Sequence, residues 1–344
     1  MDFDLDEDEI ALHDAAGDLL DALSSPERVR AAIAGDDGYD RALWKSMVDQ
    51  GWMGVALDEK RGGLGLGTVA AAVLLEQVGR HVAPVPFLPS LLALNALARA
   101  TDDGVGDAQP WVERLVAGDA VGCVAWSDGP VIAAPVADVA VIIDDDRVTA
   151  IELTADSRPR RESAMDMTRA LGWLQRDAGP AITLGGREVA DALVDLGAAF
   201  VSAEMLGGAA RVLELTVEYA KERVQFGRPI GSFQAVKHRC ADMLVDVEGM
   251  RSTAYHGAWC LGAAEPDASV AASTAKVWCS DASRRVMASG LQVHGGIGFT
   301  WEHDLHLYLK RSQLDQVTFG DAAFHRDRIA RLLRPRVEAG ESIF

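Results

Sequence analysis

The residues best suited to chemistry lie around one turn in the second half of the sequence. Its chemically useful side chains are Arg223, Gln225, Phe226, Phe233 and Gln234. Gly227 supplies the permissive backbone that a tight turn needs, and Ser232 is placed to cap the helix that opens at Phe233. A guanidinium pairs with phosphate, a phenyl ring stacks on flat rings and a helix N-terminus attracts anions, so the turn favours an anionic, aromatic ligand. A plain turn between two helices is the alternative.

Three stretches of the chain, which differ in residue pattern, must position this turn. Apolar residues recur at helical spacing up to about residue 117, and again from about residue 191 to the end. Short β-prone runs alternate with turn residues between them. The pattern predicts a mainly α protein with a small β domain, in the order N-terminal helical domain (1–117), shortened middle β domain (118–190) and C-terminal four-helix bundle (191–344).

Individual elements follow from the same patterns. Helices are predicted over residues 10–23, 43–48, 68–79, 88–100, 236–247 and 271–287. Strands are predicted over residues 121–126, 131–133, 139–143, 148–153 and 181–184. The segment 271–287 is apolar on most sides, which is typical of a central helix in a bundle.

Glycines also gather between Leu57 and Gly65. A glycine-rich loop can cradle a phosphate when it joins a strand to a helix and presents free backbone N–H groups. No strand–turn–helix context surrounds this stretch, so the pattern favours a structural turn.

Composition excludes several classes of function. The chain has 344 residues, with 49% hydrophobic and 25% charged side chains, as expected for a globular protein. Its formal net charge of −19 argues against nucleic-acid binding, and the basic residues that could offset it locally are Arg223, Arg228, Lys237, His238 and Arg239. The acidic N-terminal residues are unlike a signal or transit peptide, and no apolar run is long enough to span a membrane. We therefore expect a cytoplasmic protein.

Neither the cysteines nor the C-terminal histidines predict a metal site. The four cysteines have no zinc-like spacing. His294, His303 and His306 are not arranged for coordination either. No metal is expected.

Two C-terminal segments carry a family resemblance. They are YAKERVQFGRPIGSFQAVKHRCADM, from Tyr219 to Met243, and QVHGGIGFTWEHDLHLYLKR, from Gln292 to Arg311. Both resemble the signatures of the acyl-CoA dehydrogenases. GWMGVALDEKRGGLGLG and LLEQVGRHVAPVPF in the N-terminal part are similar to the same family. The segments occur in the family's order, whereas the middle of the chain matches poorly.

The resemblance implies an α-β-α fold, bound FAD and tetramers, with the C-terminal bundle forming the FAD and oligomer interface. It also implies α,β-dehydrogenation of an acyl-CoA thioester. In that reaction a carboxylate removes the α-proton, the β-hydride passes to the flavin and an electron-transfer flavoprotein takes the electrons. By matched position, the ADP part of FAD would contact Arg223, Gln225, Phe226, Gly227, Phe233, Gln234, Gln292, Gly295 and Gly296.

The positions that match the family's general base are not acidic here. Phe319 stands where most members carry a glutamate, and Gly197 stands at the position that other members use. A phenyl ring cannot accept a proton. Asp321, which follows closely, is the candidate catalytic carboxylate. Other acidic residues near the matched segments are Glu204, Glu302 and Asp304.

The middle of the chain departs from the family as well. The segment 125–130 is the nearest remnant of the loop that flanks flavin and substrate in the family. A chain that keeps the ADP-binding residues but lacks the base resembles the short subunit of a heteromeric acyl-CoA dehydrogenase. We therefore predict an acyl-CoA substrate, a longer family member as partner, and a homo- or heterotetramer active in lipid or steroid catabolism.

Three alternatives stay open from sequence. The chain could be a self-sufficient homo-oligomeric dehydrogenase with Asp321 as a displaced base. It could be a non-catalytic scaffold without its own flavin. It could also be a flavin monooxygenase or nitroalkane-oxidising relative, because one fold can host several chemistries.

Overall fold

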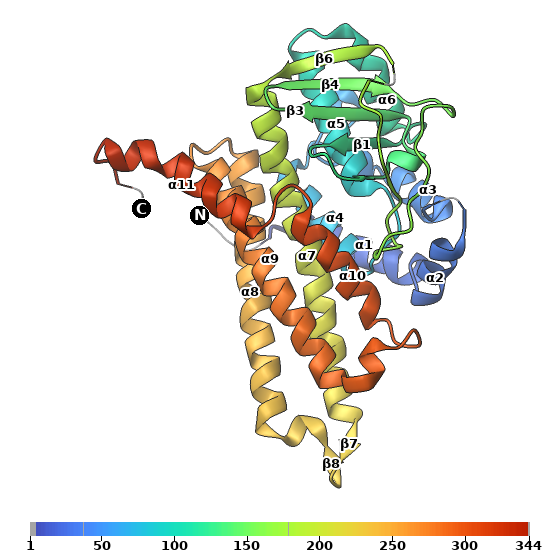
Figure 1. Cartoon of the computed structure of the whole chain (residues 1–344), viewed down its shortest axis with the longest axis vertical. Coiled ribbons are helices and arrows are strands. Elements are labelled where there is room, and N and C mark those ends of the chain that lie inside the picture. The colour runs from blue at the N-terminus through green and yellow to red at the C-terminus, as the bar shows by residue number, and fades with distance from the viewer. Residues whose placement is uncertain (1–4, 37, 178, 343–344) are drawn as a thin grey trace. The chain divides into compact units, whose positions relative to one another are not determined.

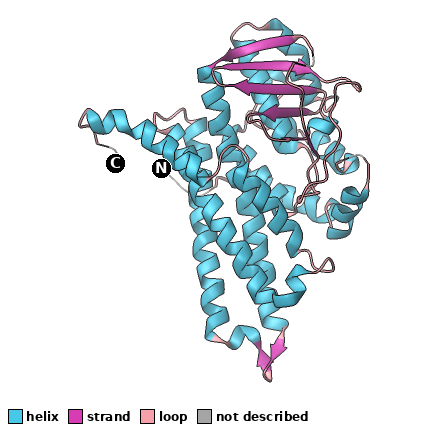
Figure 2. Cartoon of the chain, viewed as in Figure 1, coloured by secondary structure: helices cyan, strands magenta, loops and turns pink. Residues whose placement is uncertain are grey.

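The computed structural model describes residues 5–36, 38–177 and 179–342, which are mainly helical with a small β region (Figures 1 and 2). The chain divides into two compact units that are both discontinuous in sequence. One, the bundle unit, comprises residues 1–17, 75–82 and 198–344. The other, the sheet unit, comprises residues 18–74 and 83–197. Helices α1 (Glu7–Leu23), α4 (Gly67–Arg80) and α7 (Arg187–Glu222) contribute residues to both.

The sheet unit is built on a four-stranded sheet in the order β1-β3-β4-β6. Its strands are β1 (Gly122–Ala125), β3 (Val139–Asp144), β4 (Arg147–Glu152) and β6 (Ala181–Gly186). β1 runs parallel to β3, and the other neighbours are antiparallel. A separate ribbon pairs β2 (Val131–Ile132) with β5 (Leu171–Gly172). The predicted strands are therefore confirmed, and the sequence missed only the short β5 of this part.

Short helices complete the sheet unit. They are α2 (Pro26–Ala34), α3 (Arg41–Asp49), α5 (Phe87–Asp102) and α6 (Gln109–Val116), with 3₁₀ turns η1 (Trp52–Gly54), η2 (Glu59–Arg61), η3 (Gly106–Ala108) and η4 (Ala134–Val136). The side chain of Asp40 caps α3 by accepting from the N–H of Leu43 at 2.9 Å. α5 lies against the start of β1, where Ser90 Oγ accepts from the N–H of Gly122 at 3.1 Å. Because α5 is buried on nearly every side, its sequence is apolar all round.

The glycine-rich stretch after residue 57 is a structural turn. The N–H groups of Leu64, Gly65 and Leu66 donate to the carbonyls of residues 54, 57 and 55 at 2.8–2.9 Å. A Cβ on Gly63 would lie 2.1 Å from the carbonyl oxygen of Leu57, so only glycine fits that close approach. Since these N–H groups are already used inside the chain, the phosphate-cradle alternative is wrong.

The bundle unit packs the C-terminal half of α7 with α8 (Gln234–Gly262), α9 (Ala268–His294), α10 (Leu305–Val317) and α11 (Ala322–Glu338). β7 (Val224–Gln225) and β8 (Arg228–Pro229) form a hairpin between α7 and α8, followed by the turn η5 (Ile230–Ser232). The turn η6 (Gly295–Phe299) follows α9. Buried apolar side chains of four helices meet in the core, among them Leu206, Met250, Val286 and Leu305.

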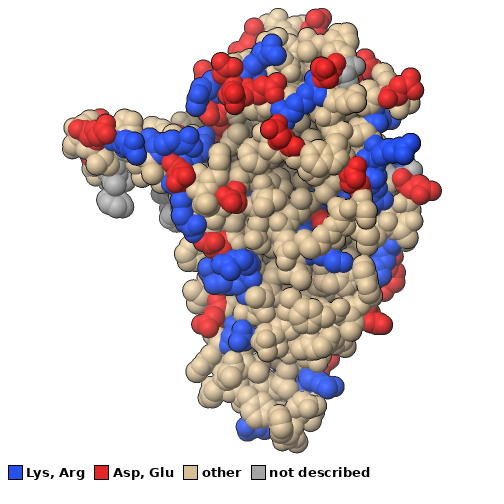
Figure 3. All heavy atoms as spheres, in the orientation of Figure 1, with Lys and Arg blue, Asp and Glu red and all other residues tan. Residues whose placement is uncertain are grey.

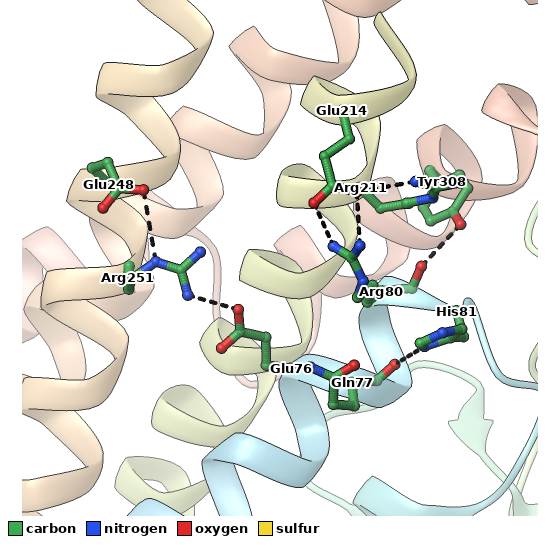
Figure 4. Close-up of polar contacts among 9 residues, drawn as sticks. All are labelled: Glu76, Gln77, Arg80, His81, Arg211, Glu214, Glu248, Arg251 and Tyr308. Carbon is green, nitrogen blue, oxygen red and sulfur yellow. Dashed lines mark hydrogen bonds and ion pairs between the residues drawn. The ribbon is translucent and has the colours of Figure 1, made fainter. Parts of the chain in front are cut away.

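The end of α4 belongs to the bundle unit and crosses α7 at very short range. A Cβ on Gly207 would lie 1.8 Å from the carbonyl oxygen of Glu76, and one on Gly79 would lie 1.9 Å from that of Glu204. Polar contacts fasten the crossing (Figure 4): Arg80 pairs with both carboxylate oxygens of Glu214 at 2.7 Å, Arg251 pairs with Glu76 at 2.8 Å, and Tyr308 donates to the carbonyl of Arg80 at 2.9 Å. Glycines at 79 and 207 are thus what allows these helices to touch.

Candidate functional site

The predicted ligand-binding turn is a two-stranded hairpin with a strained tip. Gln225 pairs with Arg228 across the hairpin, which leaves Phe226 and Gly227 as its two-residue turn. Both have positive φ, 53° for Phe226 and 78° for Gly227, as a type I′ turn requires. Gly227 adopts this conformation freely, whereas a phenylalanine there is strained. The Phe226 side chain is nevertheless 92% exposed, so packing among the described residues offsets little of that strain.

Phe233 and Arg228 complete a small aromatic and cationic cluster at the hairpin. The rings of Phe226 and Phe233 lie edge to face with centroids 6.1 Å apart. The guanidinium of Arg228 lies 4.2 Å from the centroid of Phe233, within cation–π range. A flat, anionic ligand would find both a ring and a positive charge there.

Two local predictions about this turn are wrong. α7 ends at Glu222, so Arg223 follows the helix rather than lying in its last turn. α8 begins at Gln234 with Phe233 as its uncapped N-cap residue. The hydroxyl of Ser232 donates instead to the carbonyl of Pro229 at 2.7 Å, because residues 230–232 form a 3₁₀ turn before the helix.

The second segment ends α9 with two open glycines. Gln292, Gly295 and Gly296 are exposed. Gly295 closes the helix with φ 64° and ψ −142°, a conformation that essentially requires glycine. Gly296 is different: it has no positive φ, and a Cβ there would meet nothing within 4 Å. No contact among the described residues therefore requires a glycine at position 296, which leaves room for an outside molecule to approach the backbone.

The structure brings the two segments together at the same end of the bundle helices (Figure 1). Tyr219 of α7 stacks on His294 of α9 with ring centroids 4.5 Å apart. Arg239 of α8 donates to Ser289 of α9 at 3.4 Å nearby. All nine predicted cofactor-binding residues are thus on or beside the α7–α8 turn and the end of α9.

This end of the bundle unit carries exposed basic and apolar side chains. Arg223, Arg228, Lys237, His238 and Arg239 are all exposed. Figure 3 shows separate basic side chains on a mostly uncharged surface at the lower end of the view. Ile297 and Phe299 of η6 are 44% and 71% exposed. Neighbouring exposed apolar side chains are typical of surfaces that bind other molecules.

The turn at the family's base position is buried and firmly held. Phe319 is 4% exposed and has a φ of 55°. Its carbonyl accepts from Nε2 of the fully buried His325 at 2.7 Å. Lys276, also fully buried, donates to the carbonyls of Asp315 and Gln316 at 2.9 Å and so caps the end of α10. Burial lowers the pKa of Lys276 to about 8. The turn therefore has a fixed conformation, with a phenyl ring at the position of the base.

The other candidate carboxylates have structural partners. Asp321 caps α11 by accepting from the N–H of Phe324 at 2.8 Å, although the residue itself is exposed. Glu204 is buried and forms an ion pair with Arg311 at 2.5 Å. Glu204 is therefore held in a buried ion pair and is not solvated. Backbone and Thr300 hydrogen bonds lower the pKa of the exposed Glu302. Gly197 and Ala198 supply no acid.

Acid should weaken the fold through His325. Burial lowers its pKa from 6.5 to about 4, so the folded protein keeps it neutral while the unfolded chain takes up a proton below pH 6.5. Stability from this group is complete above pH 6.5 and is lost as the pH falls through 4, by up to about 3 kcal/mol. Urea unfolding at pH 7 and pH 4.5 should show a smaller loss for His325→Gln than for the unchanged protein. Equal losses in both proteins would contradict the prediction.

The remnant of the family's flavin-side loop follows β1. Arg176, from a distant part of the sequence, donates to the carbonyl of Ser127 in this loop. It also donates to the carboxylate of Asp144 at the end of β3 and so links the loop to that strand. Sequence reasoning missed Arg176 because no local pattern marks it. It also missed the Tyr219–His294 stack, although both residues stand inside the quoted signatures.

Comparison with known proteins assigns the family. The chain matches the model of the acyl-CoA dehydrogenase N-terminal domain over residues 6–119 and that of the acyl-CoA dehydrogenase C-terminal domain over residues 185–333. The chain belongs to the acyl-CoA dehydrogenase family, oxidoreductases that act on CH–CH groups. The fold prediction is confirmed.

Similar proteins include acyl-CoA dehydrogenases of mycobacteria, a complex of two differently named chains and a protein described as a steroid acyl-CoA dehydrogenase. It is 38% identical to the acyl-CoA dehydrogenase IpdE2 of Mycolicibacterium smegmatis, over 90% of this chain and 93% of that protein. It is 32% identical to FadE27 of Mycobacterium tuberculosis, over 97% and 99%. The ChsE4–ChsE5 complex of M. tuberculosis is similar in structure, with a TM-score of 0.86, 30% identity and coverage of 97% and 99%. The Tcur3481–Tcur3483 steroid acyl-CoA dehydrogenase gives a TM-score of 0.87 at 28% identity, with coverage of 96% and 99%.

The described residues were also compared with the requirements of a metal site and of a membrane-spanning helix. Among the described residues, no group of histidine, cysteine, aspartate or glutamate side chains is placed to hold a metal ion. Within the same residues, no helix combines the length and apolarity needed to cross a membrane.

Proposed function

We propose that this chain is the short subunit of a heteromeric, FAD-dependent acyl-CoA dehydrogenase and that it completes the FAD site of a longer partner. The observation that carries the proposal is a contrast within the bundle unit. The hairpin and the end of α9 carry mostly exposed side chains, with Phe233 half-buried, while the residue at the family's base position is a buried phenylalanine. The similar ChsE4–ChsE5 structure is a complex of two differently named chains, and this supports a second, different chain as partner.

The residues present fit the ADP part of FAD. Arg223 and Arg228 supply exposed positive charge for the pyrophosphate, and the start of the 29-residue helix α8 adds its partial positive charge. The exposed ring of Phe226 offers a stacking face for adenine. Gly296, which no internal contact requires, allows close approach of the backbone. Gln225, Gly227, Phe233, Gln234, Gln292 and Gly295 complete the proposed set.

Bound FAD would supply the acceptor for the substrate's β-hydride. This chain's own residues would hold and orient the ADP part and shield it from water. The α-proton would be removed by a carboxylate of the partner, because Phe319 has no basic group. An electron-transfer flavoprotein is the proposed oxidant. The similarity to a protein described as a steroid acyl-CoA dehydrogenase favours a bulky, ring-bearing acyl group as substrate.

Co-expression with a longer family member encoded beside it tests the proposal. We expect the pair to co-purify with flavin. The visible absorbance of that flavin should fall on anaerobic addition of a ring-bearing acyl-CoA. Replacing the partner's glutamate by glutamine should abolish this loss of absorbance. Full flavin loading and bleaching by this chain alone would sink the heteromeric proposal. Failure of both the chain and the pair to retain flavin would instead favour a scaffold.

Asp321 defines a second candidate, a self-sufficient dehydrogenase. The residue is exposed, lies directly after the Phe319–Gly320 turn, and uses Oδ1 to cap α11. Asp321→Asn keeps an oxygen for the cap but removes the base. If the flavin of this chain is bleached by substrate without a partner, Asp321→Asn should abolish that bleaching. Full activity in the variant would exclude Asp321 as the general base.

Gly296 provides a prediction specific to the proposed FAD surface. Gly296→Ala should change the free energy of unfolding by less than about 0.5 kcal/mol, since the added methyl group meets nothing. The same change should raise the Kd for FAD of the pair about tenfold or more, by blocking close approach. Fluorescence titration and urea unfolding measure the two effects. Gly106→Ala is the matched control, because its Cβ also meets nothing, and it should alter neither quantity.

A further inference from the structure

Three aromatic rings join the two signature segments, and none of them belongs to the proposed contact set. Tyr219 precedes the hairpin on α7, and His294 ends α9 directly before Gly295. Their rings stack at 4.5 Å with an angle of 21° between their planes. His303 meets His294 edge to face at 4.7 Å. The column therefore spans from the helix that leads into the hairpin to the segment that follows the glycine turn.

His294 contributes the shape of its ring rather than its polarity. It is 4% exposed, and its Nδ1 lies 2.8 Å from the carbonyl oxygen of Gly290. A carbonyl only accepts, so Nδ1 carries the proton and Nε2 is left with a lone pair. Within the described residues that buried Nε2 has no hydrogen-bond partner. Burial lowers the pKa of His294, which favours the neutral form of the ring. A buried nitrogen without a partner lowers stability. The favourable contribution of the side chain at this position therefore comes from its flat ring, which stacks on Tyr219.

The stack is well placed to control the geometry of both segments. The carbonyl of Tyr219 accepts from the N–H of Arg223 at 2.9 Å, which ties the first hairpin residue to the stacked residue. His294 is covalently joined to Gly295, and the N–H of Gly295 donates to the carbonyl of Leu291. A shift of either ring would thus move the arginine or the glycines directly.

We propose that His294 is a positioning residue that, by stacking on Tyr219, fixes the hairpin relative to the glycine turn and so pre-forms the surface for the ADP part of FAD. The inference rests on the proposed function and assigns a role to a residue that does not itself touch the cofactor. Pre-formed surfaces bind more tightly because less conformational freedom is lost on binding.

Three variants of the assembled pair test the role of His294, with FAD as the titrated probe. His294→Ala removes the ring, His294→Phe keeps it, and Met250→Ala makes a cavity in the bundle core away from the site, where Met250 is fully buried. We expect His294→Ala to raise the Kd for FAD about tenfold. His294→Phe should restore affinity to within about twofold, and Met250→Ala should lower the Tm at least as much as His294→Ala while leaving the Kd unchanged.

The outcomes separate the inference from the proposed function. Equal weakening of FAD binding in His294→Ala and Met250→Ala would reduce the effect to general loss of stability and overturn the inference. Failure of His294→Phe to rescue binding would overturn it as well. If the unchanged pair binds no FAD, the proposed function itself fails. Should His294→Ala not fold, Tyr219→Ala removes the other ring of the stack: it should weaken FAD binding about tenfold while Tyr219→Phe binds normally, and normal binding by Tyr219→Ala would overturn the inference.

Discussion

Gly207→Ala is expected to prevent stable folding. The new Cβ would lie 1.8 Å from the carbonyl oxygen of Glu76 and 2.7 Å from the backbone nitrogen of Arg80, and both are helix backbone atoms that cannot turn aside. α4 and α7 would have to separate, which would disrupt the Arg80–Glu214 and Arg251–Glu76 ion pairs (Figure 4). We expect a loss of more than about 4 kcal/mol, measured by urea unfolding or as failure to recover soluble protein.

Gly208 is the matched control for this prediction. It is the next residue of α7, but a Cβ there would meet its nearest neighbours at 3.6 and 3.8 Å, which is ordinary contact. Gly208→Ala should therefore be tolerated, and could gain up to about 1 kcal/mol from alanine's higher helix propensity. Similar stabilities for the two variants would show that the crossing is not as close as described.

The second large effect is expected for Arg311→Met. Arg311 and Glu204 form an ion pair in which the side chains are 4% and 0% exposed. Removing the arginine leaves a buried carboxylate facing an apolar group, and such changes cost about 3–5 kcal/mol. Urea unfolding at pH 7 measures the loss. Replacing Glu204 as well, in an Arg311→Met, Glu204→Leu double variant, should recover most of it, because the uncompensated charge is then gone.

Arg285→Met serves as the control for charge removal. Arg285 pairs with Asp246, but its side chain is 47% exposed. Asp246 is 13% exposed, but water reaches the half-exposed arginine, so the pair contributes less than a fully buried one and the loss should stay below about 2 kcal/mol. An Arg311→Met variant no less stable than Arg285→Met would mean that water reaches Glu204.

Local patterns predicted much of the fold. Alternating β-prone runs marked β1, β2, β3, β4 and β6, because each is long enough or apolar enough to stand out between turn residues. β5, β7 and β8 each contain only two residues and, unlike the equally short β2, do not lie within a longer β-prone run. Ser232 looked like a helix cap, but an intervening 3₁₀ turn gave its hydroxyl another partner.

The candidate site was predictable where it is local in sequence. The turn around Phe226 was predicted from its arginine, aromatic and glycine residues, and Gly295 and Gly296 were singled out by the family resemblance. The contacts that organise them join distant residues, and periodicity holds no information about such pairs. Glu204 and Arg311 are 107 residues apart, and Arg176 lies 49 residues from the loop residue Ser127 that it holds. The nine cofactor-binding residues and the catalytic role of Asp321 stay predictions.

The discontinuity of the bundle unit has a consequence for how the chain folds as it is made. Residues 75–82 leave the ribosome early, yet Arg251, the partner of Glu76, follows 175 residues later. Closing so long a loop is entropically unfavourable until the later helices arrive. The growing chain therefore holds Glu76 and Gly79 at the end of α4 without their partners until Gly207 of α7 and Arg251 of α8 have been made. We expect fragments separated after residue 190 not to fold independently, because the bundle unit takes residues from both.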